Sequence, residues 1–151
     1  MNVATFLWFN GQAEEAADYY TTLFDDSRIV DVQRANADGP ATSVTFELGG
    51  QRFIAFNGEL RFAFTSAISL YVRCATQDEV DRTWAGLTLG GQEGPGGSLT
   101  DRFGVTWQVI PEALDVLLQD ADPAAAERVL TVLHNMTKIE MQALHDVHNA
   151  S

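Results

Sequence analysis

The sequence has little of several features that would point to a particular class of protein. It holds one cysteine, Cys74, so no disulfide can form within the chain, and a reducing compartment such as the cytoplasm fits. It has nine Lys and Arg against 21 Asp and Glu, a formal charge of -12, and no basic cluster. Because nucleic-acid phosphates are bound by basic side chains, we expect no nucleic-acid partner. No apolar run approaches the ~18 residues that cross a bilayer, and residues 1–5 lack a basic leader, so we expect neither membrane insertion nor secretion.

What the sequence does have is enough apolar material for one ordinary domain. Apolar residues make up 46% of 151 residues and charged residues 20%. A chain of this length buries roughly two-thirds of the surface that it exposes when unfolded, which supports a core without disulfides.

The first part of the chain has the pattern of a strand, a helix and three strands. Residues 5–9 are β-prone, and residues 12–24 repeat apolar side chains at steps of three and four, which indicates an amphipathic helix. Residues 28–34, 42–48 and 51–57 read as strands, and the Gly-Gly pair between the last two predicts a two-residue hairpin turn.

The same order then begins again. We expect a strand over 67–74 and a helix over 76–87, where Thr76 and Glu79 have the spacing of a capping box. A loop over 90–97 and further short strands follow, among them residues 98–100 and 105–110, and this order predicts that a βαβββ unit occurs twice.

Three further helices are expected at the C-terminal end, over residues 112–119, 123–136 and 139–146. The predicted fold class is therefore α+β, or mixed α/β. Residues 1–111 are expected to form a paired βαβββ domain, and residues 112–151 a helical extension of the same domain.

Two segments resemble a known group of proteins. Residues 6–16 (FLWFNGQAEEA) and 101–111 (DRFGVTWQVIP) are similar to the opening and closing strands of PhnB-like proteins, and the resemblance extends to residue 144. This group is often labelled 3-demethylubiquinone-9 3-methyltransferase-like. It belongs to the vicinal oxygen chelate superfamily of glyoxalases, bleomycin resistance proteins and dioxygenases. The resemblance implies two modules whose eight strands form a curled sheet around a cavity, and usually a homodimer.

The resemblance also allows a test for a metal site. Metal-dependent relatives place four side chains, typically His or Gln and Glu, in the cavity. The matching positions here are Thr5, Ala55, Ala67 and Gln108, of which only Gln108 could bind a metal ion. Shifting any strand by one residue supplies no further ligand, so we expect no metal and no cofactor. The histidines, His134, His145 and His148, are expected on the solvated surface of the C-terminal helices.

Strand alternation predicts which residues line the cavity. Large apolar side chains such as Phe6, Trp8, Phe56 and Trp107 are expected against the helices. If Glu47 is desolvated, its pKa should rise, which would make it a general base or the counter-charge for a cation; otherwise it is a solvent-facing carboxylate at a strand end. The candidate ligand-binding residues are Thr5, Leu7, Phe9, Glu47, Ala55, Asn57, Ser69, Tyr71 and Gln108.

The leading hypothesis for function is metal-independent binding of a small organic molecule in this cavity, for sequestration or sensing. One alternative is an enzyme of the superfamily, of lyase, isomerase or dioxygenase type, or the methyltransferase of the family label. The glycines of residues 90–97 do not fit the G-x-G-x-x-G turn of adenosyl-type cofactor sites. Another alternative is a structural dimer without a ligand. No catalytic residue is assigned.

Overall fold

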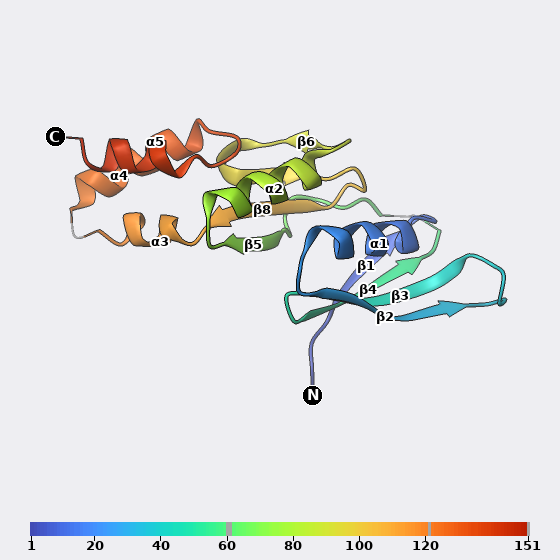
Figure 1. The fold of residues 1–151 in the computed structure, drawn as a ribbon. Coiled ribbons are helices and arrows are strands. Elements are labelled where there is room, and N and C mark those ends of the chain that lie inside the picture. Colours follow the sequence, from blue (N-terminus) through green and yellow to red (C-terminus); the bar gives the residue numbers. More distant parts are fainter. Residues whose placement is uncertain (60–61, 121, 151) are drawn as a thin grey trace. The chain divides into compact units, whose positions relative to one another are not determined.

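The computed structural model describes residues 1–59, 62–120 and 122–150, which fold into two compact units (Figure 1). The first unit is Met1–Ala63 and the second is Phe64–Ser151. Each unit contains a four-stranded sheet with helix packed against it, so the fold is mixed α+β. The strands form two separate sheets, and the predicted single eight-stranded sheet is not confirmed.

The first unit has the strand order β1-β4-β3-β2. β1 pairs with β4 in parallel, and the other neighbours are antiparallel. The hairpin between β3 and β4 turns at Gly49 and Gly50, whose φ angles of 56° and 79° are the positive values that a tight hairpin of this kind needs. The elements are β1 (Thr5–Phe9), α1 (Ala13–Leu23), β2 (Ser27–Arg34), β3 (Ala41–Leu48) and β4 (Gln51–Asn57).

The core of the first unit lies between α1 and one face of this sheet (Figure 1). α1 contributes small side chains and one ring, because Ala13, Ala16, Ala17 and Tyr20 are all fully buried. The Tyr20 ring lies 6.2 Å from the ring of Phe46, measured between centroids. The sheet side of this core consists of Leu7, Phe9, Val44, Phe46, Leu48, Phe53 and Ala55.

The second unit repeats the order with β5-β8-β7-β6, so the predicted duplication of the βαβββ unit is confirmed. The capping interactions of α2 are also present, since Thr76 Oγ1 accepts from Glu79 N at 3.2 Å and Glu79 Oε2 accepts from Ala75 N at 2.7 Å. The elements are β5 (Leu70–Cys74), α2 (Gln77–Thr88), β6 (Gln92–Glu93), the short 3-10 helix η1 (Pro95–Gly97), β7 (Ser98–Thr100) and β8 (Thr106–Pro111).

A buried carboxylate organises the turn between β7 and β8. Asp101 Oδ1 accepts hydrogen bonds from Phe103 N at 2.9 Å and Val105 N at 3.0 Å, and its Oδ2 accepts from Trp107 Nε1 at 2.8 Å. Gly104 adopts the φ of 90° that closes the turn. The segment that carries part of the family resemblance is therefore a packing motif.

Three helices complete the second unit: α3 (Ala113–Leu118), α4 (Pro123–His134) and α5 (Met141–His148). Asp122 caps α4 by accepting from Ala124 N at 3.0 Å, as its position before Pro123 favours. None of the helices in the described ranges has the length and apolar character that a bilayer-spanning segment needs. Their shared core consists of Ile110, Leu114, Leu117, Val129, Leu133, Ile139, Met141 and Leu144.

Candidate functional site

The first sheet has one face under α1 and one face that α1 does not cover. We call the face that α1 does not cover the open face of the first sheet. The register pairs Phe6 with Ile54 and Trp8 with Phe56 across β1 and β4. It also pairs Ile54 with Thr45 across β4 and β3. These residues alternate with the buried ones along each strand, so they all point away from α1. The open face consists of Phe6, Trp8, Arg28, Asp31, Gln33, Ser43, Thr45, Glu47, Arg52, Ile54 and Phe56.

Four aromatic rings gather at this face, which we call the aromatic wall: Phe6, Trp8, Phe56 and Phe62. The Trp8 ring meets that of Phe56 edge-on at 5.2 Å and that of Phe62 at 6.1 Å, while the rings of Phe6 and Phe56 lie 5.6 Å apart. Yet Phe6 is 54% exposed and Trp8 is 40% exposed. The wall is therefore a preformed apolar surface that the first unit does not use for its own core.

A group of charged side chains lies at one end of the open face. Glu47 Oε2 accepts from Arg28 Nε at 3.1 Å, and Glu47 Oε1 accepts from Arg52 at 2.7 Å. The hydrogen bond from Arg52, with the charge of Arg28, lowers the pKa of Glu47. The condition under which Glu47 was expected to act as a base, a raised pKa, is not met. Glu47 is a paired, ionised carboxylate.

On the second sheet, the face that carries Tyr71 and Gln108, which we call its open face, is more polar. On β5 and β8, Tyr71 pairs with Gln108, and Gln108 Nε2 donates to Ser69 Oγ at 2.8 Å. Tyr71 is about half exposed. The partial burial of its side chain, together with the charge of Asp115, raises the pKa of Tyr71. Leu70, Val72 and Trp107 point to the other face of this sheet, and Trp107 is buried, as predicted.

For β1 and β4 the predicted faces are wrong. Leu7, Phe9 and Ala55 are buried in the core under α1, and Thr5 has the same parity. The sequence of β1, TFLWF, is apolar at nearly every position, so hydrophobic alternation does not decide which side is buried. Phe6, Trp8 and Phe56, expected against the helix, instead form the aromatic wall.

Asn57 has a structural role on the covered side. Its Oδ1 accepts from Ala13 N at 2.9 Å, and its Nδ2 donates to Ala41 O at 2.9 Å. It therefore connects the first turn of α1 to the start of β3. The ligand-binding candidates that remain on open faces are Glu47, Ser69, Tyr71 and Gln108; their roles as ligand contacts remain predictions.

The positions matched to metal ligands are distributed between different faces. Thr5 and Ala55 lie on the covered side of the first sheet, Ala67 precedes β5, and the Gln108 amide is bonded to Ser69. Within residues 1–59, 62–120 and 122–150, no three His, Cys, Asp or Glu side chains gather as a metal ion would need. His148, expected on a solvated surface, pairs through Nε2 with Asp120 Oδ2 at 2.7 Å.

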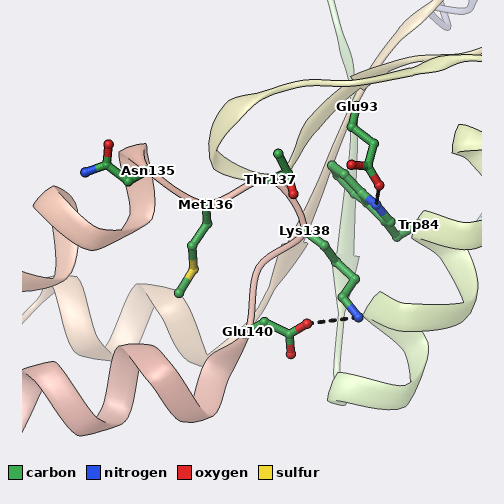
Figure 2. Close-up of a pocket in the computed structure, with 7 residues that line it drawn as sticks. All are labelled: Trp84, Glu93, Asn135, Met136, Thr137, Lys138 and Glu140. Atoms are coloured by element: carbon green, nitrogen blue, oxygen red, sulfur yellow. Dashed lines mark hydrogen bonds and ion pairs between the residues drawn. The ribbon is translucent and has the colours of Figure 1, made fainter.

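The second unit also contains a hollow of about 530 Å³ between α2, β6 and the segment joining α4 to α5 (Figure 2). Its charged groups already form ion pairs and hydrogen bonds within the protein. Lys138 Nζ lies 2.7 Å from Asp81 Oδ1 and 2.9 Å from Glu140 Oε1, and Trp84 Nε1 donates to Glu93 Oε1 at 2.9 Å. This arrangement joins the α4–α5 segment to α2 and leaves little charge for a ligand.

Two βαβββ units, each with a helix over one sheet face, define a vicinal oxygen chelate protein. Residues 1–110 match the sequence model of the 3-demethylubiquinone-9 3-methyltransferase family, and the chain belongs to that family as a PhnB-like member. The resemblance expected for residues 128–144 lies beyond this match. No curated protein matches the chain.

Solved structures agree with this assignment. The PhnB protein from Bacillus cereus is 37% identical, with 74% of this chain and 99% of that chain covered and a TM-score of 0.68. PA1353 from Pseudomonas aeruginosa is 20% identical over 74% of this chain and 98% of that chain, with a TM-score of 0.64. The fosfomycin resistance protein FosX from Listeria monocytogenes, complexed with Mn(II) and sulfate, is 12% identical over 72% and 89%, with a TM-score of 0.54. At the last two identities the likeness concerns the fold alone.

Proposed function

We propose that this protein binds a small organic molecule without a metal ion, on the open face of a sheet. In this proposal it acts as a homodimer in the cytoplasm and sequesters or senses its ligand. The observation that carries the proposal is the aromatic wall, which is exposed although the core of its own unit is complete without it.

The wall has the chemistry of a ligand surface. Small-molecule sites combine apolar and aromatic walls with a few polar groups that fix orientation. Phe6, Trp8 and Phe56 supply large flat surfaces, and their mutual contacts, edge-on between Trp8 and each phenylalanine, hold the rings in place before any ligand arrives. An exposed patch of this kind marks a binding surface more often than a folding requirement.

The second sheet offers polar groups on its own open face. The hydroxyl of Tyr71 and the amide oxygen of Gln108 lie on paired positions of β5 and β8, and the bond to Ser69 fixes the Gln108 side chain. A hydroxyl and an amide offer both donors and acceptors without a charge. They suit a ligand with carbonyl or hydroxyl groups.

Metal independence is supported by the donor set. On its open face the first sheet offers two carboxylates: both oxygens of Glu47 are bonded to arginines, and Asp31 accepts a hydrogen bond from Gln33 of its own strand. Gln108 adds a neutral amide, which alone does not hold a divalent ion against water. FosX, which shares the fold, is described with Mn(II), so the rival is an enzyme that recruits a metal through other residues.

Thermal unfolding in the presence of a chemically diverse set of small molecules tests the binding. A ligand that binds only the folded state at 100 times its Kd stabilises the protein by about 2.7 kcal/mol. We expect Phe6→Ala to abolish this shift and Val116→Ala, which shortens another exposed apolar side chain on α3, to preserve it. No shift with any compound would refute the proposal.

Elemental analysis of untagged protein separates the rivals. We expect less than one transition metal ion per ten chains, whereas a stoichiometric metal lost on changing Gln108→Ala would establish the enzyme alternative. Sedimentation analysis addresses the dimer, which is expected at twice the chain mass of 16.5 kDa.

A further inference from the structure

The open face of the first sheet joins an aromatic region to a group with net positive charge. Glu47 is a single carboxylate between two guanidinium groups, those of Arg28 and Arg52. The three charges of this group sum to +1, and Asp31, which faces Thr45 on the same side of the sheet, accepts a hydrogen bond from Gln33. Two guanidinium groups beside exposed rings are a local feature that the formal charge of -12 for the whole chain does not explain.

The charged group can bind an anion more readily than a cation. Both oxygens of Glu47 are already accepting hydrogen bonds from the arginines, so a cationic ligand would have to displace a guanidinium to reach this carboxylate. Each guanidinium has five N–H donors, and the side chains of Arg28 and Arg52 are 64% and 45% exposed. The donors that do not reach Glu47 are free to bind an anion.

The spacing along β4 fixes the distance between charge and rings. Arg52 precedes Ile54 by two residues and Phe56 by four, and all three point from the open face. At a strand rise of roughly 3.3 Å per residue, these positions lie about 7 Å and about 13 Å from Arg52. Phe6 and Trp8 lie beside Ile54 and Phe56 in the neighbouring strand. A ligand of one or two fused rings spans this interval.

Gly58 keeps the far end of the wall in place. Its N–H donates to Phe9 O at 3.0 Å, which brings its backbone against the rings. A Cβ there would lie 2.6 Å from Trp8 Nε1 and 2.7 Å from Phe56 Cε1. The indole of Trp8 is thus packed against backbone on one side and has its exposed part toward the open face.

We propose that the ligand of this face is an aromatic carboxylate, whose ring lies on Phe6 and Trp8 and whose carboxylate accepts hydrogen bonds from Arg52. This inference rests on the proposed function, since it names the chemical class of the molecule that the open face binds. Arginine donors paired with a carboxylate give stronger hydrogen bonds than neutral donors, and their planar shape selects a planar acid.

Calorimetric titration with 2-naphthoate, 2-naphthalenemethanol and cyclohexanecarboxylate tests the two halves of the ligand. We expect naphthoate to bind about tenfold more tightly than the neutral alcohol, because a charge-assisted hydrogen bond is replaced by a neutral one. Cyclohexanecarboxylate, which has the charge without the flat ring, should bind at least tenfold more weakly than naphthoate.

Variants assign the effect to the charged group. Arg52→Gln should weaken naphthoate about tenfold and leave the alcohol unchanged, whereas Arg34→Gln, the same charge change at a residue paired with Glu14 of α1, should change neither. Glu47→Gln leaves both guanidiniums unneutralised and should tighten naphthoate severalfold, a gain that loss of folding cannot produce.

The outcomes separate this inference from the proposed function. If the alcohol binds as tightly as naphthoate, or if Arg34→Gln weakens naphthoate as much as Arg52→Gln, the carboxylate assignment is overturned while small-molecule binding stands. If none of the three compounds binds but a cationic compound shifts the thermal transition, the ligand class is again wrong. If no compound of any charge binds, the proposed function itself falls.

Discussion

Asp101 offers the sharpest test of how the second unit is held together. The carboxylate is 4% exposed and accepts from two backbone N–H groups and the Trp107 indole. Replacing it in Asp101→Ala leaves these three buried donors without that acceptor, and each buried unsatisfied donor costs about 1–2 kcal/mol. We expect a loss of about 3–6 kcal/mol in the free energy of unfolding, a large share of the total for a unit of this size.

Urea denaturation followed by tryptophan fluorescence measures this loss. Asp146→Ala is the matched control, because it removes a carboxylate that is exposed on α5, and it should change stability by less than about 0.5 kcal/mol. Asp101→Asn keeps one acceptor oxygen and should lie between the two. The account of this turn is wrong if Asp101→Ala costs less than about 1 kcal/mol or no more than the Asp146 variant.

Three other changes test the core, a glycine and an ion pair. Phe46→Ala removes a fully buried ring and should destabilise the first unit by about 3–5 kcal/mol in urea. Gly97→Ala should lower the melting temperature, since its φ is 83° and a Cβ would lie 2.8 Å from a carbonyl oxygen, more than Gly11→Ala, which has a similar φ but open space. Lys138→Gln should raise the pKa of Asp81, which the Lys138 hydrogen bond lowers, as a carboxyl NMR titration would record. Because that pKa is depressed in the folded state, the stability it contributes is present above about pH 4 and lost as the pH falls through the folded value, and this acid dependence should flatten in the Lys138 variant.

The order of elements could be predicted because local signals are strong and agree with one another. A Gly-Gly pair between two apolar runs of equal length specifies the hairpin of β3 and β4, and the helix periods of α1 and α2 are regular. β6, with the two residues Gln92 and Glu93, lies in the segment expected to be a loop, because a strand so short has no alternation to detect. β5 begins at Leu70 instead of residue 67 for a related reason, since nothing in the apolar segment marks where pairing with β8 starts.

The candidate site was harder to predict because it depends on which face of the sheet each strand residue points to. In β1 and β4 large apolar side chains occupy both faces, so ranking residues by hydrophobicity assigns the aromatic ones to the core. The hairpin contains the information that corrects this. A two-residue turn at Gly49 and Gly50 makes Glu47 face Arg52 and Thr45 face Ile54, and residues opposite each other share a face. Polar Thr45 thus identifies the side of Ile54 as the open one.

The side chains of α1 also explain why the largest ring of β1 lies on the open face. α1 approaches the sheet closely because it presents Ala13, Ala16 and Ala17, and the face beneath it is filled by Leu7, Ala55 and the stacked pair of Phe46 and Phe53. Ridges of alanine leave no room there for an indole. A Trp at position 8 therefore fits the open face, where space is not limited by a helix.

Folding alone gives no reason for rings at positions 6 and 8. An exposed apolar ring contributes little to the stability of its unit and increases the risk of association, which polar β-branched residues at the same strand positions would avoid. The open face of β3 contains such a residue, Thr45, in the row of Phe6 and Ile54. In our proposal, this contrast within one row of one sheet is explained by a ligand that the aromatic side chains contact. Under the same proposal, the two arginines around Glu47 decide which class of ligand this face favours.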